Sequence, residues 1–149
     1  MHVLISLMTA CLVLATAFSA AAQTAVERGR YLVEVLGACG NCHTPKGPQG
    51  DVPGKHLAGG FQLEDAFGTW ITPNITPDPE TGLGGWKDGE IIASLYGVRR
   101  GGGRVLPPMP TQHYAQGIAE ADLRAILAYL RALPPIRNQV PVPEPPKKP

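Results

Sequence analysis

The hydrophobic and polar positions divide the chain into one long apolar stretch, three shorter amphipathic segments and the loops between them. Residues 3–22 carry no charged side chain, and the stretch closes on Ala20-Ala21-Ala22-Gln23. An apolar run that ends in small residues is typical of an export signal, with cleavage before Gln23. The run is also long enough to be an uncleaved membrane anchor. In either case residues 1–22 predict that the rest of the chain is exported.

The first amphipathic segment predicts a helix that starts at Thr24 and ends near Gly37. Thr24 and Glu27 have the spacing of a capping box, and apolar residues follow at helical intervals. Gly29 lies inside this helix, where glycine costs roughly 1 kcal/mol relative to alanine. A second helix that crosses closely at this point would explain the glycine; a tolerated weak position is the other explanation.

Two further helices are predicted after residue 85. The first covers residues 88–96 and ends at Gly97, because its apolar residues share one face. The last helix has the clearest pattern, an apolar stripe that stops at Pro134-Pro135 and consists of Leu123, Ile126, Leu127, Leu130 and Leu133.

The remaining segments are rich in glycine and proline. Residues 44–85 and 97–116 show little periodicity and predict long loops, with at most one short turn in the first. Residues 136–149 form a proline-rich tail, which is predicted to extend along the domain surface or to be free. The pattern therefore predicts one domain over residues 23–135, between the export segment and the tail.

The charged side chains all lie after residue 22 and nearly balance, with 13 Lys and Arg against 12 Asp and Glu. This balance argues against nucleic acid as a partner and against strong long-range steering of any partner. The 18 glycines and 16 prolines make the domain rich in loops. Such loops are easier to order around a large rigid cofactor than around themselves.

A C-x-x-C-H motif, Cys39-Gly40-Asn41-Cys42-His43, supplies the candidate chemistry. Two thiols at this spacing can add to the two vinyl groups of one porphyrin, and the adjacent imidazole can bind the iron as proximal ligand. The motif therefore predicts one haem c, attached covalently through Cys39 and Cys42. Half of a zinc site and a thioredoxin-type dithiol are the alternatives. The other cysteine, Cys11, lies in the export segment and supports neither.

The order of these elements resembles class I cytochromes c, and most closely the monohaem domains that act as electron-transfer subunits of bacterial periplasmic dehydrogenases. The resemblance covers nearly all of residues 24–143, and its most specific segments are Arg30-Tyr31-Leu32, the haem motif, and residues 71–78 and 81–86. It implies an all-α cytochrome c fold of three to five helices, with long loops wrapped around the haem and the first and last helices crossing beside it. Relatives of this type often carry two or three haem motifs, whereas this chain has one and would hold a single electron.

The sixth iron position has three candidates after the motif: His56, Met109 and His113. The resemblance places a methionine ligand in a proline-rich loop before the last helix, where Met109 stands between two prolines. Proline fixes φ and stiffens such a loop, so the thioether would be held at small entropic cost. His43 and Met109 are therefore the predicted iron ligands, with His113 as the second distal candidate and His56 expected on a loop surface.

Haem propionates need hydrogen-bond donors. Trp70 and Arg99 are the predicted donors, and Tyr96, Arg100 and Arg104 are further candidates. A packed core tryptophan is the alternative for Trp70, and a solvated surface position is the alternative for Arg99 and Arg100.

The proximal imidazole also needs a carbonyl acceptor for its second ring N–H. Pro45 or Pro48 is expected to present this carbonyl, since the family favours a proline just after the motif. Residues 72–78 predict either a loop at the haem edge or a surface for a partner.

Together these features predict an exported c-type cytochrome that transfers single electrons. His/Met ligation raises the reduction potential, which suits a periplasmic carrier that accepts electrons from a dehydrogenase and passes them to an oxidase or another cytochrome of the respiratory chain. Six-coordinate iron leaves no open site, so no catalysis is expected. The alternatives are a haem-based sensor or enzyme with an open distal site, and a zinc or dithiol domain without haem.

Overall fold

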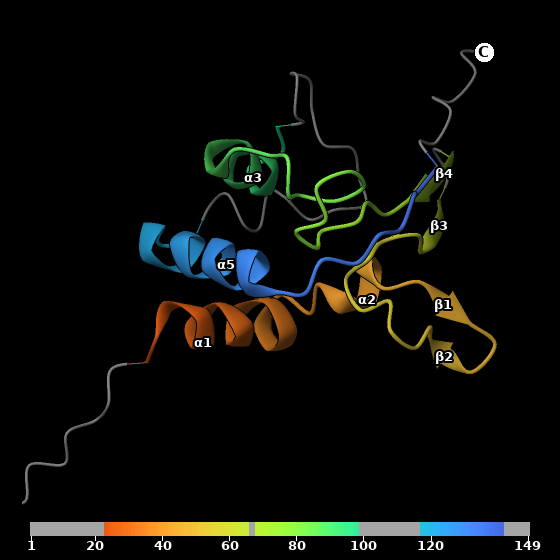
Figure 1. The fold of residues 1–149 in the computed structure, drawn as a ribbon, viewed down its shortest axis with the longest axis horizontal. Helices are drawn as coiled ribbons and strands as arrows, with labels where there is room; N and C mark the ends of the chain where they lie inside the picture. The colour runs from red at the N-terminus through yellow and green to blue at the C-terminus, as the bar shows by residue number, and fades with distance from the viewer. Residues whose placement is uncertain (1–22, 66–67, 99–116, 142–149) are drawn as a thin grey trace, which may run out of the picture.

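The computed structural model describes residues 23–65, 68–98 and 117–141 (Figure 1). The predicted export segment, the loop that carries Arg99, Met109 and His113, and the last eight residues lie outside the described residues. The described part has helical segments and two small antiparallel hairpins. Their bounds are α1 (Ala25–Arg30), η1 (Tyr31–Leu36), α2 (Gly40–His43), β1 (Lys46–Gly47), β2 (Gly50–Asp51), β3 (Gln62–Asp65), β4 (Gly68–Ile71), α3 (Asp88–Leu95) and α5 (Glu120–Ala132).

The N-terminal helix begins with the predicted capping box. The Glu27 backbone N–H donates to Thr24 Oγ1 at 3.2 Å, and the Thr24 N–H donates to Glu27 Oε2 at 2.9 Å. The helix also ends at Gly37, as predicted, but its second half, η1, is a π-helix. The Gly37 N–H donates to Leu32 O at 2.7 Å, which is the wider spacing of that helix type. The apolar pattern gave no sign of this change.

Helices α1 and α5 cross closely, so the first of the two explanations for Gly29 is confirmed. Gly29 is buried, and a Cβ added to it would lie 1.9 Å from the backbone oxygen of Ala125 and 2.7 Å from Tyr129 Cβ. No side chain fits in that space. Arg28 adds a two-point ion pair across the crossing, with Nε 2.8 Å from Asp122 Oδ1 and Nη2 3.1 Å from Oδ2.

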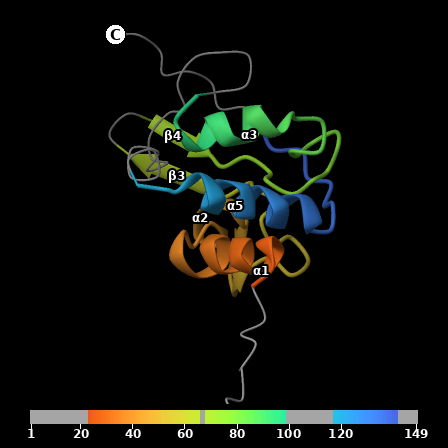
Figure 2. The same ribbon diagram turned by 90° about the vertical axis from the view of Figure 1, so that its left-hand side faces the viewer.

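Helix α5 lies between α1 on one side and α3 on the other, as both views show (Figures 1 and 2). Helix α3 has nearly the predicted bounds, and Gly97 follows it with a φ of +85°. The buried apolar side chains come from all three layers and the loops beside them: Val33, Leu57, Leu83, Ile91 and Leu130. The stripe predicted for the last helix therefore faces the core: Leu123 and Leu130 are buried, and Ile126, Leu127 and Leu133 are partly buried and pack against it.

The expectation of long loops with at most one turn over residues 44–85 is wrong in detail. Strands β1 and β2 form one hairpin, and β3 and β4 form a second, in which Leu63 pairs with Trp70. These strands are only two to four residues long, so a period-two pattern had too few positions to stand out. The fold is helical, as expected, with these two small sheets added.

The loop over residues 72–84 is held by buried polar side chains. Thr72, Asn74, Thr76 and Asp78 are all at most 8% exposed. Asn74 Nδ2 donates to Ile136 O at 2.7 Å, and its Oδ1 accepts from the Thr76 N–H at 2.9 Å. The loop therefore has its own hydrogen-bonded core.

The first residues of the proline-rich tail close this loop. The Ile136 N–H donates to Thr76 Oγ1 at 3.1 Å. Asn138 donates from its backbone to Thr81 Oγ1 at 3.0 Å and from Nδ2 to Ala58 O at 2.9 Å. The described start of the tail thus lies against the domain.

Candidate haem attachment site

The motif residues lie at one short helix, α2. Cys39 is its N-cap residue and is partly buried, whereas Cys42 is exposed, and both are free thiols. Residues three apart on a helix face the same side, so both sulfur atoms can reach one porphyrin. Ala38 brings the chain from η1 into α2 through a left-handed conformation, with a φ of +44°.

His43 is oriented by a carbonyl from a distant loop. Its Nδ1 lies 2.9 Å from Pro73 O, which makes Nδ1–H the donor and leaves Nε2 available for iron. Burial lowers the pKa of His43 more than the Pro73 hydrogen bond raises it. The imidazole is therefore neutral at physiological pH, and the neutral form is the one that binds metals.

The expected acceptors, Pro45 and Pro48, do not make this contact. Pro45 O instead accepts the Val52 N–H at 2.9 Å, because the chain after the motif turns at once into the β1–β2 hairpin. The acceptor comes from thirty residues further along, in the segment for which the sequence left two interpretations open. Residues 72–78 thus support the proximal side of the site.

Gly59 holds His43 and Pro73 together. Its N–H donates to His43 O at 2.7 Å, and an added Cβ would lie 2.4 Å from the Pro73 carbonyl carbon. Its φ of +72° also lies in the region that favours glycine. Neither the hydrophobic pattern nor a turn motif singled out this glycine, since its role depends on a contact between segments far apart in sequence.

The thiols do not match a redox dithiol. Burial, followed by the negative charge of Glu34, raises the pKa of Cys39 to about 11. Redox-active cysteines have lowered pKa values. The described residues also contain no group of three His, Cys, Asp or Glu side chains that could hold a metal ion.

Trp70 has a polar atom without a partner. Its Nε1 is buried and is the one buried side-chain nitrogen or oxygen in the described residues that makes no hydrogen bond. A buried N–H without an acceptor is costly. The atom is thus free to donate to a bound acidic group, and the residues present fit a haem: two thiols, an oriented imidazole and a free donor.

The other predicted site residues fall into two groups, those outside the described residues and those that the structure places. Arg99, Met109, His113, Arg100 and Arg104 lie outside the described residues. Tyr96 is the C-cap residue of α3 and is 42% exposed. His56 is half-exposed on a loop, as predicted, but it contacts Glu34 at 2.9 Å, which the sequence did not indicate.

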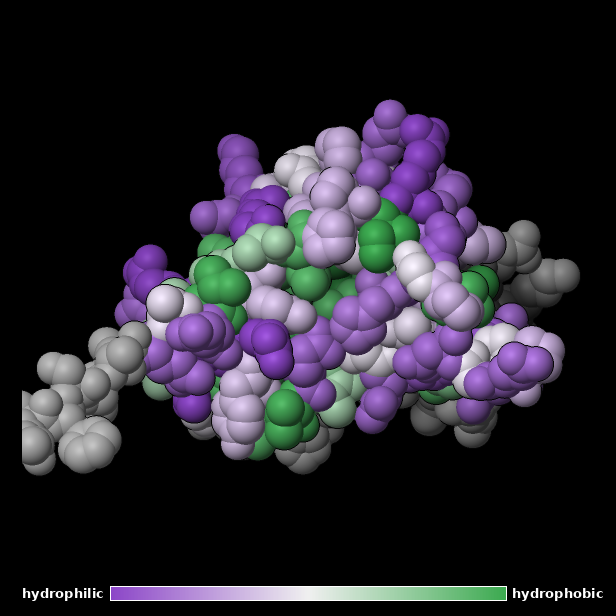
Figure 3. Space-filling model, turned by 60° about the horizontal axis from the view of Figure 1, so that its bottom comes forward, coloured by the Kyte–Doolittle hydropathy of each residue, from purple (hydrophilic) through white to green (hydrophobic). Residues whose placement is uncertain are grey.

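The surface beside the motif carries exposed apolar side chains. On η1, Val35 and Leu36 are each 62% exposed, and Tyr31 is 42% exposed. Figure 3 brings the α1 side of the molecule forward and shows apolar surface in separate patches among polar side chains. These three apolar side chains of η1 precede Cys39 in the chain and are available for contact with a partner.

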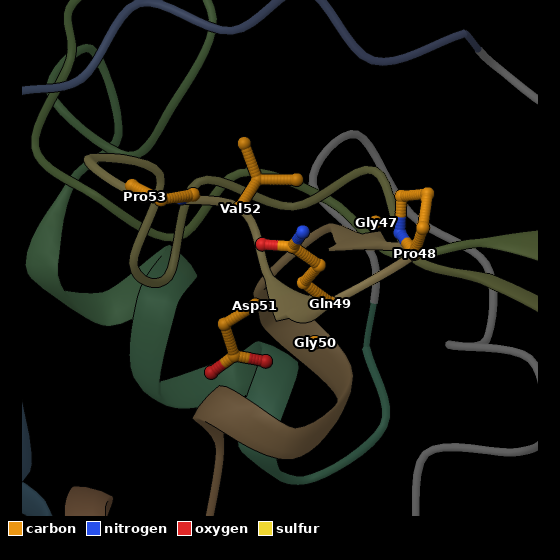
Figure 4. A pocket seen from close by; sticks show the side chains of 7 residues that line it. All are labelled: Gly47, Pro48, Gln49, Gly50, Asp51, Val52 and Pro53. Carbon is orange, nitrogen blue, oxygen red and sulfur yellow. The ribbon is translucent and has the colours of Figure 1, made fainter.

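A hollow also lies in the β1–β2 hairpin (Figure 4). It is lined by consecutive residues of that hairpin, Gly47 to Pro53. Of the residues predicted for the site it includes only Pro48, which does not contact the imidazole, and it brings together no distant parts of the chain. We assign it no role in the site.

Residues 26–134 match the cytochrome c family. Among curated proteins, the chain is 38% identical to one of the subunits of nicotinate dehydrogenase from Pseudomonas putida over 78% of its length. It is 37% identical to the fructose dehydrogenase cytochrome subunit of Gluconobacter japonicus over 72%, and 35% identical to the cytochrome c subunit of a quinone-dependent alcohol dehydrogenase of Gluconobacter oxydans over 74%. The chain therefore belongs to the cytochrome c family.

The chain spans only a small part of these relatives: 9% of the first, 22% of the second and 24% of the third. Membership of the family implies covalently bound haem c. That Cys39, Cys42 and His43 hold it stays a prediction from the C-x-x-C-H motif. No helix in the described ranges is both long and apolar enough to cross a bilayer.

Proposed function

We propose that this protein is a periplasmic c-type cytochrome that accepts single electrons from a dehydrogenase and passes them to an oxidase or another cytochrome of the respiratory chain. Cys39 and Cys42 attach one haem c, and His43 and Met109 bind its iron. When bound, the haem supplies the one-electron chemistry, and the chain supplies ligation, burial and orientation. Export is proposed from the apolar segment of residues 3–22.

The hydrogen bond from His43 to Pro73 O carries this proposal. A ligating histidine donates its second N–H to a fixed acceptor, which sets both its tautomer and its ring orientation. The 2.9 Å contact provides that arrangement, next to two thiols at the correct spacing. Gly59 packs against the Pro73 carbonyl and donates to His43 O, and Asn74, the residue after Pro73, is hydrogen-bonded to Ile136 O, so the imidazole is preorganised for iron.

Three relatives are named as subunits of dehydrogenases for three different substrates, nicotinate, fructose and alcohol, so the donor is proposed only as a dehydrogenase. The near balance of charge on this chain supports contact through apolar surface rather than through long-range attraction. The exposed side chains of η1 offer such a surface beside the attachment motif.

Absorption spectra of the exported, haem-loaded protein in both oxidation states test the proposal. We expect a sharp low-spin reduced spectrum and, in the ferric protein, the weak long-wavelength band of sulfur-to-iron ligation. Met109→Ala should abolish that band, and His113→Ala, the matched control in the same loop, should retain it. A ferric band that survives Met109→Ala, or carbon monoxide binding to the reduced native protein, would contradict His/Met ligation.

The indole of Trp70 is proposed as a donor to a haem propionate, supported by its buried, unpartnered Nε1. Arg99 is proposed for the same role because a guanidinium can donate to a carboxylate. Trp70→Phe keeps the ring packing but removes the donor. We expect the variant to attach haem, to show a shifted midpoint potential and to lose the native indole N–H resonance; an unchanged potential would contradict the role.

A further inference from the structure

A cluster of three polar side chains lies beside the attachment motif and has no part in the ligation described above. Glu34 is on η1, Tyr129 is on α5 and His56 is on the loop before the second hairpin. The Tyr129 hydroxyl donates to Glu34 Oε1 at 2.6 Å, and His56 Nε2 lies 2.9 Å and 3.0 Å from the two carboxylate oxygens. One carboxylate is thus fixed from two sides.

The cluster is positioned against α2. A Cβ added to Gly40, inside the motif, would lie 3.0 Å from His56 Cε1, so the imidazole lies directly over that glycine. His56 is held there by Leu57, which is fully buried and has a φ of +58°. The Leu57 N–H donates to Thr44 Oγ1 at 3.1 Å, and its carbonyl accepts the Ile75 N–H at 3.0 Å. A left-handed leucine is strained, and these contacts maintain it.

The negative charge of Glu34 acts on the Cys39 thiol in the attachment motif. Its carboxylate is the second cause, after burial, of the raised pKa of the Cys39 thiol. Burial, the hydrogen bond to Glu34 and the Glu34 charge also raise the pKa of Tyr129 to about 12. The phenol therefore stays neutral and remains a donor at physiological pH.

Few other charges face the cluster. Arg30 on α1 acts weakly on Tyr129 in the opposite direction. Lys55, next to His56 in sequence, donates to Arg137 O at 3.0 Å and is engaged there. Cys39 and Cys42 are the titratable groups on α2 apart from His43, and haem attachment removes both thiols. His56 is left as the group beside Glu34 whose side-chain type changes charge between about pH 5 and 8.

We propose that Glu34 sets the reduction potential of the haem and that His56 makes this potential depend on pH. A negative charge near the iron stabilises the ferric state and lowers the potential. Protonation of His56 offsets that charge. When one electron reaches the haem from a reduced partner, or from dithionite in the test, the added negative charge favours uptake of a proton from water by His56. This inference rests on the proposed function.

The test is a spectroscopic redox titration of the haem-loaded protein between about pH 5 and 8. We expect the native potential to fall as pH rises, because His56 loses its charge. Glu34→Gln should raise the potential at every pH, whereas Glu34→Asp, which keeps the charge, should restore a value near the native one. His56→Gln should flatten the dependence, with its largest difference from the native protein at acidic pH.

Glu120→Gln is the matched control, since it removes the same charge from the exposed start of α5, where the pair with Arg124 lies. It should leave the potential unchanged. Equal shifts in Glu34→Gln and Glu120→Gln, or a flat native profile, would overturn the inference while a normal low-spin spectrum left the proposed function standing. A protein without attached haem, or with a high-spin spectrum, would instead overturn the proposed function.

Discussion

Two regions of the molecule are held together by different kinds of contact. At the α1–α5 crossing, two backbones approach so closely that Gly29 has no room for a Cβ, and the contact is mainly one of shape. In the loop over residues 72–84, the buried side chains are polar, and the contact is one of paired donors and acceptors. The first region packs the N-terminal helix that precedes α2 against α5, and the second orients His43 through Pro73.

The difference predicts different kinds of sensitivity. A close-packed contact fails when volume is added, because backbones cannot rotate out of the way. A buried polar network fails when one partner is removed, because the others then lose their hydrogen bonds without regaining water. Substitutions matched to each case test this distinction.

Gly29→Ala should have the largest effect. The added methyl group would lie 1.9 Å from Ala125 O, so the helices must separate, and we expect a loss of about 3 kcal/mol in the free energy of unfolding. Urea titration of the haem-loaded protein, followed by circular dichroism, measures it. Gly89→Ala on α3 is the control: nothing lies within 4 Å, and a gain of about 0.5 kcal/mol is expected. Equal effects at both glycines would contradict the close crossing.

Asn74→Ala should have the next largest effect, about 2 kcal/mol, since it leaves the Thr76 N–H without its acceptor and the Ile136 carbonyl with only the longer 3.3 Å bond from Thr76 Oγ1. The same titration measures it, and the His43 ring resonances should move as well, because Asn74 adjoins Pro73. Gln49→Ala, at an exposed hairpin position, should change stability by less than about 0.5 kcal/mol. A loss no larger than that of the control would show that the network does not stabilise the loop.

Asp78→Asn tests the charge within the same network. Hydrogen bonds from the Thr81 side chain and backbone lower the pKa of Asp78 below its ordinary value of 3.8. The carboxylate therefore stabilises the fold above that value, and this contribution is lost as pH falls through the lowered pKa. Asparagine keeps the Oδ1 acceptor, so the variant should lose less stability than the native protein between neutral and acidic pH. Unfolding curves of identical pH dependence would refute this.

The ion pair between Arg28 and Asp122 should contribute least. Both side chains are partly exposed, so solvent screens the pair even though its geometry is two-pronged. A double-mutant cycle with Arg28→Gln and Asp122→Asn should give a favourable coupling smaller than the effect of Asn74→Ala. The more exposed pair of Arg124 and Glu120 should give none above error. Salt should weaken the first coupling, and a salt-independent value would argue against a charge interaction.

The two regions also differ in how well the sequence predicted them. The two helices of the crossing were predictable because their signals are local: a capping box for the first and a leucine stripe at helical spacing for the last. The crossing itself was expected from the family resemblance, because Gly29 alone left two explanations open. The motif at Cys39 was predictable for a similar reason, since its chemistry depends on five consecutive residues.

The polar loop was not predictable in the same way. The acceptor for His43 is Pro73, and the nearer prolines proposed for that role do not contact the imidazole. Gly59 and the contact between Glu34 and His56 likewise depend on residues brought together only by the folded chain. Local sequence patterns do not identify contacts between residues that are far apart in sequence. Threonines and asparagines in a loop predict turns, but not the distant groups to which they bond.

The support of His43 depends on residues after Pro135, which are synthesised later than the haem motif. Pro73 orients the imidazole, and Ile136 and Asn138 close the loop behind it. A chain that emerges with its N-terminus first presents Cys39 and Cys42 well before those closing residues exist. The thiols are therefore made before the residues that complete the support of His43, and the final orientation of this ligand depends on a segment more than ninety residues further along the chain.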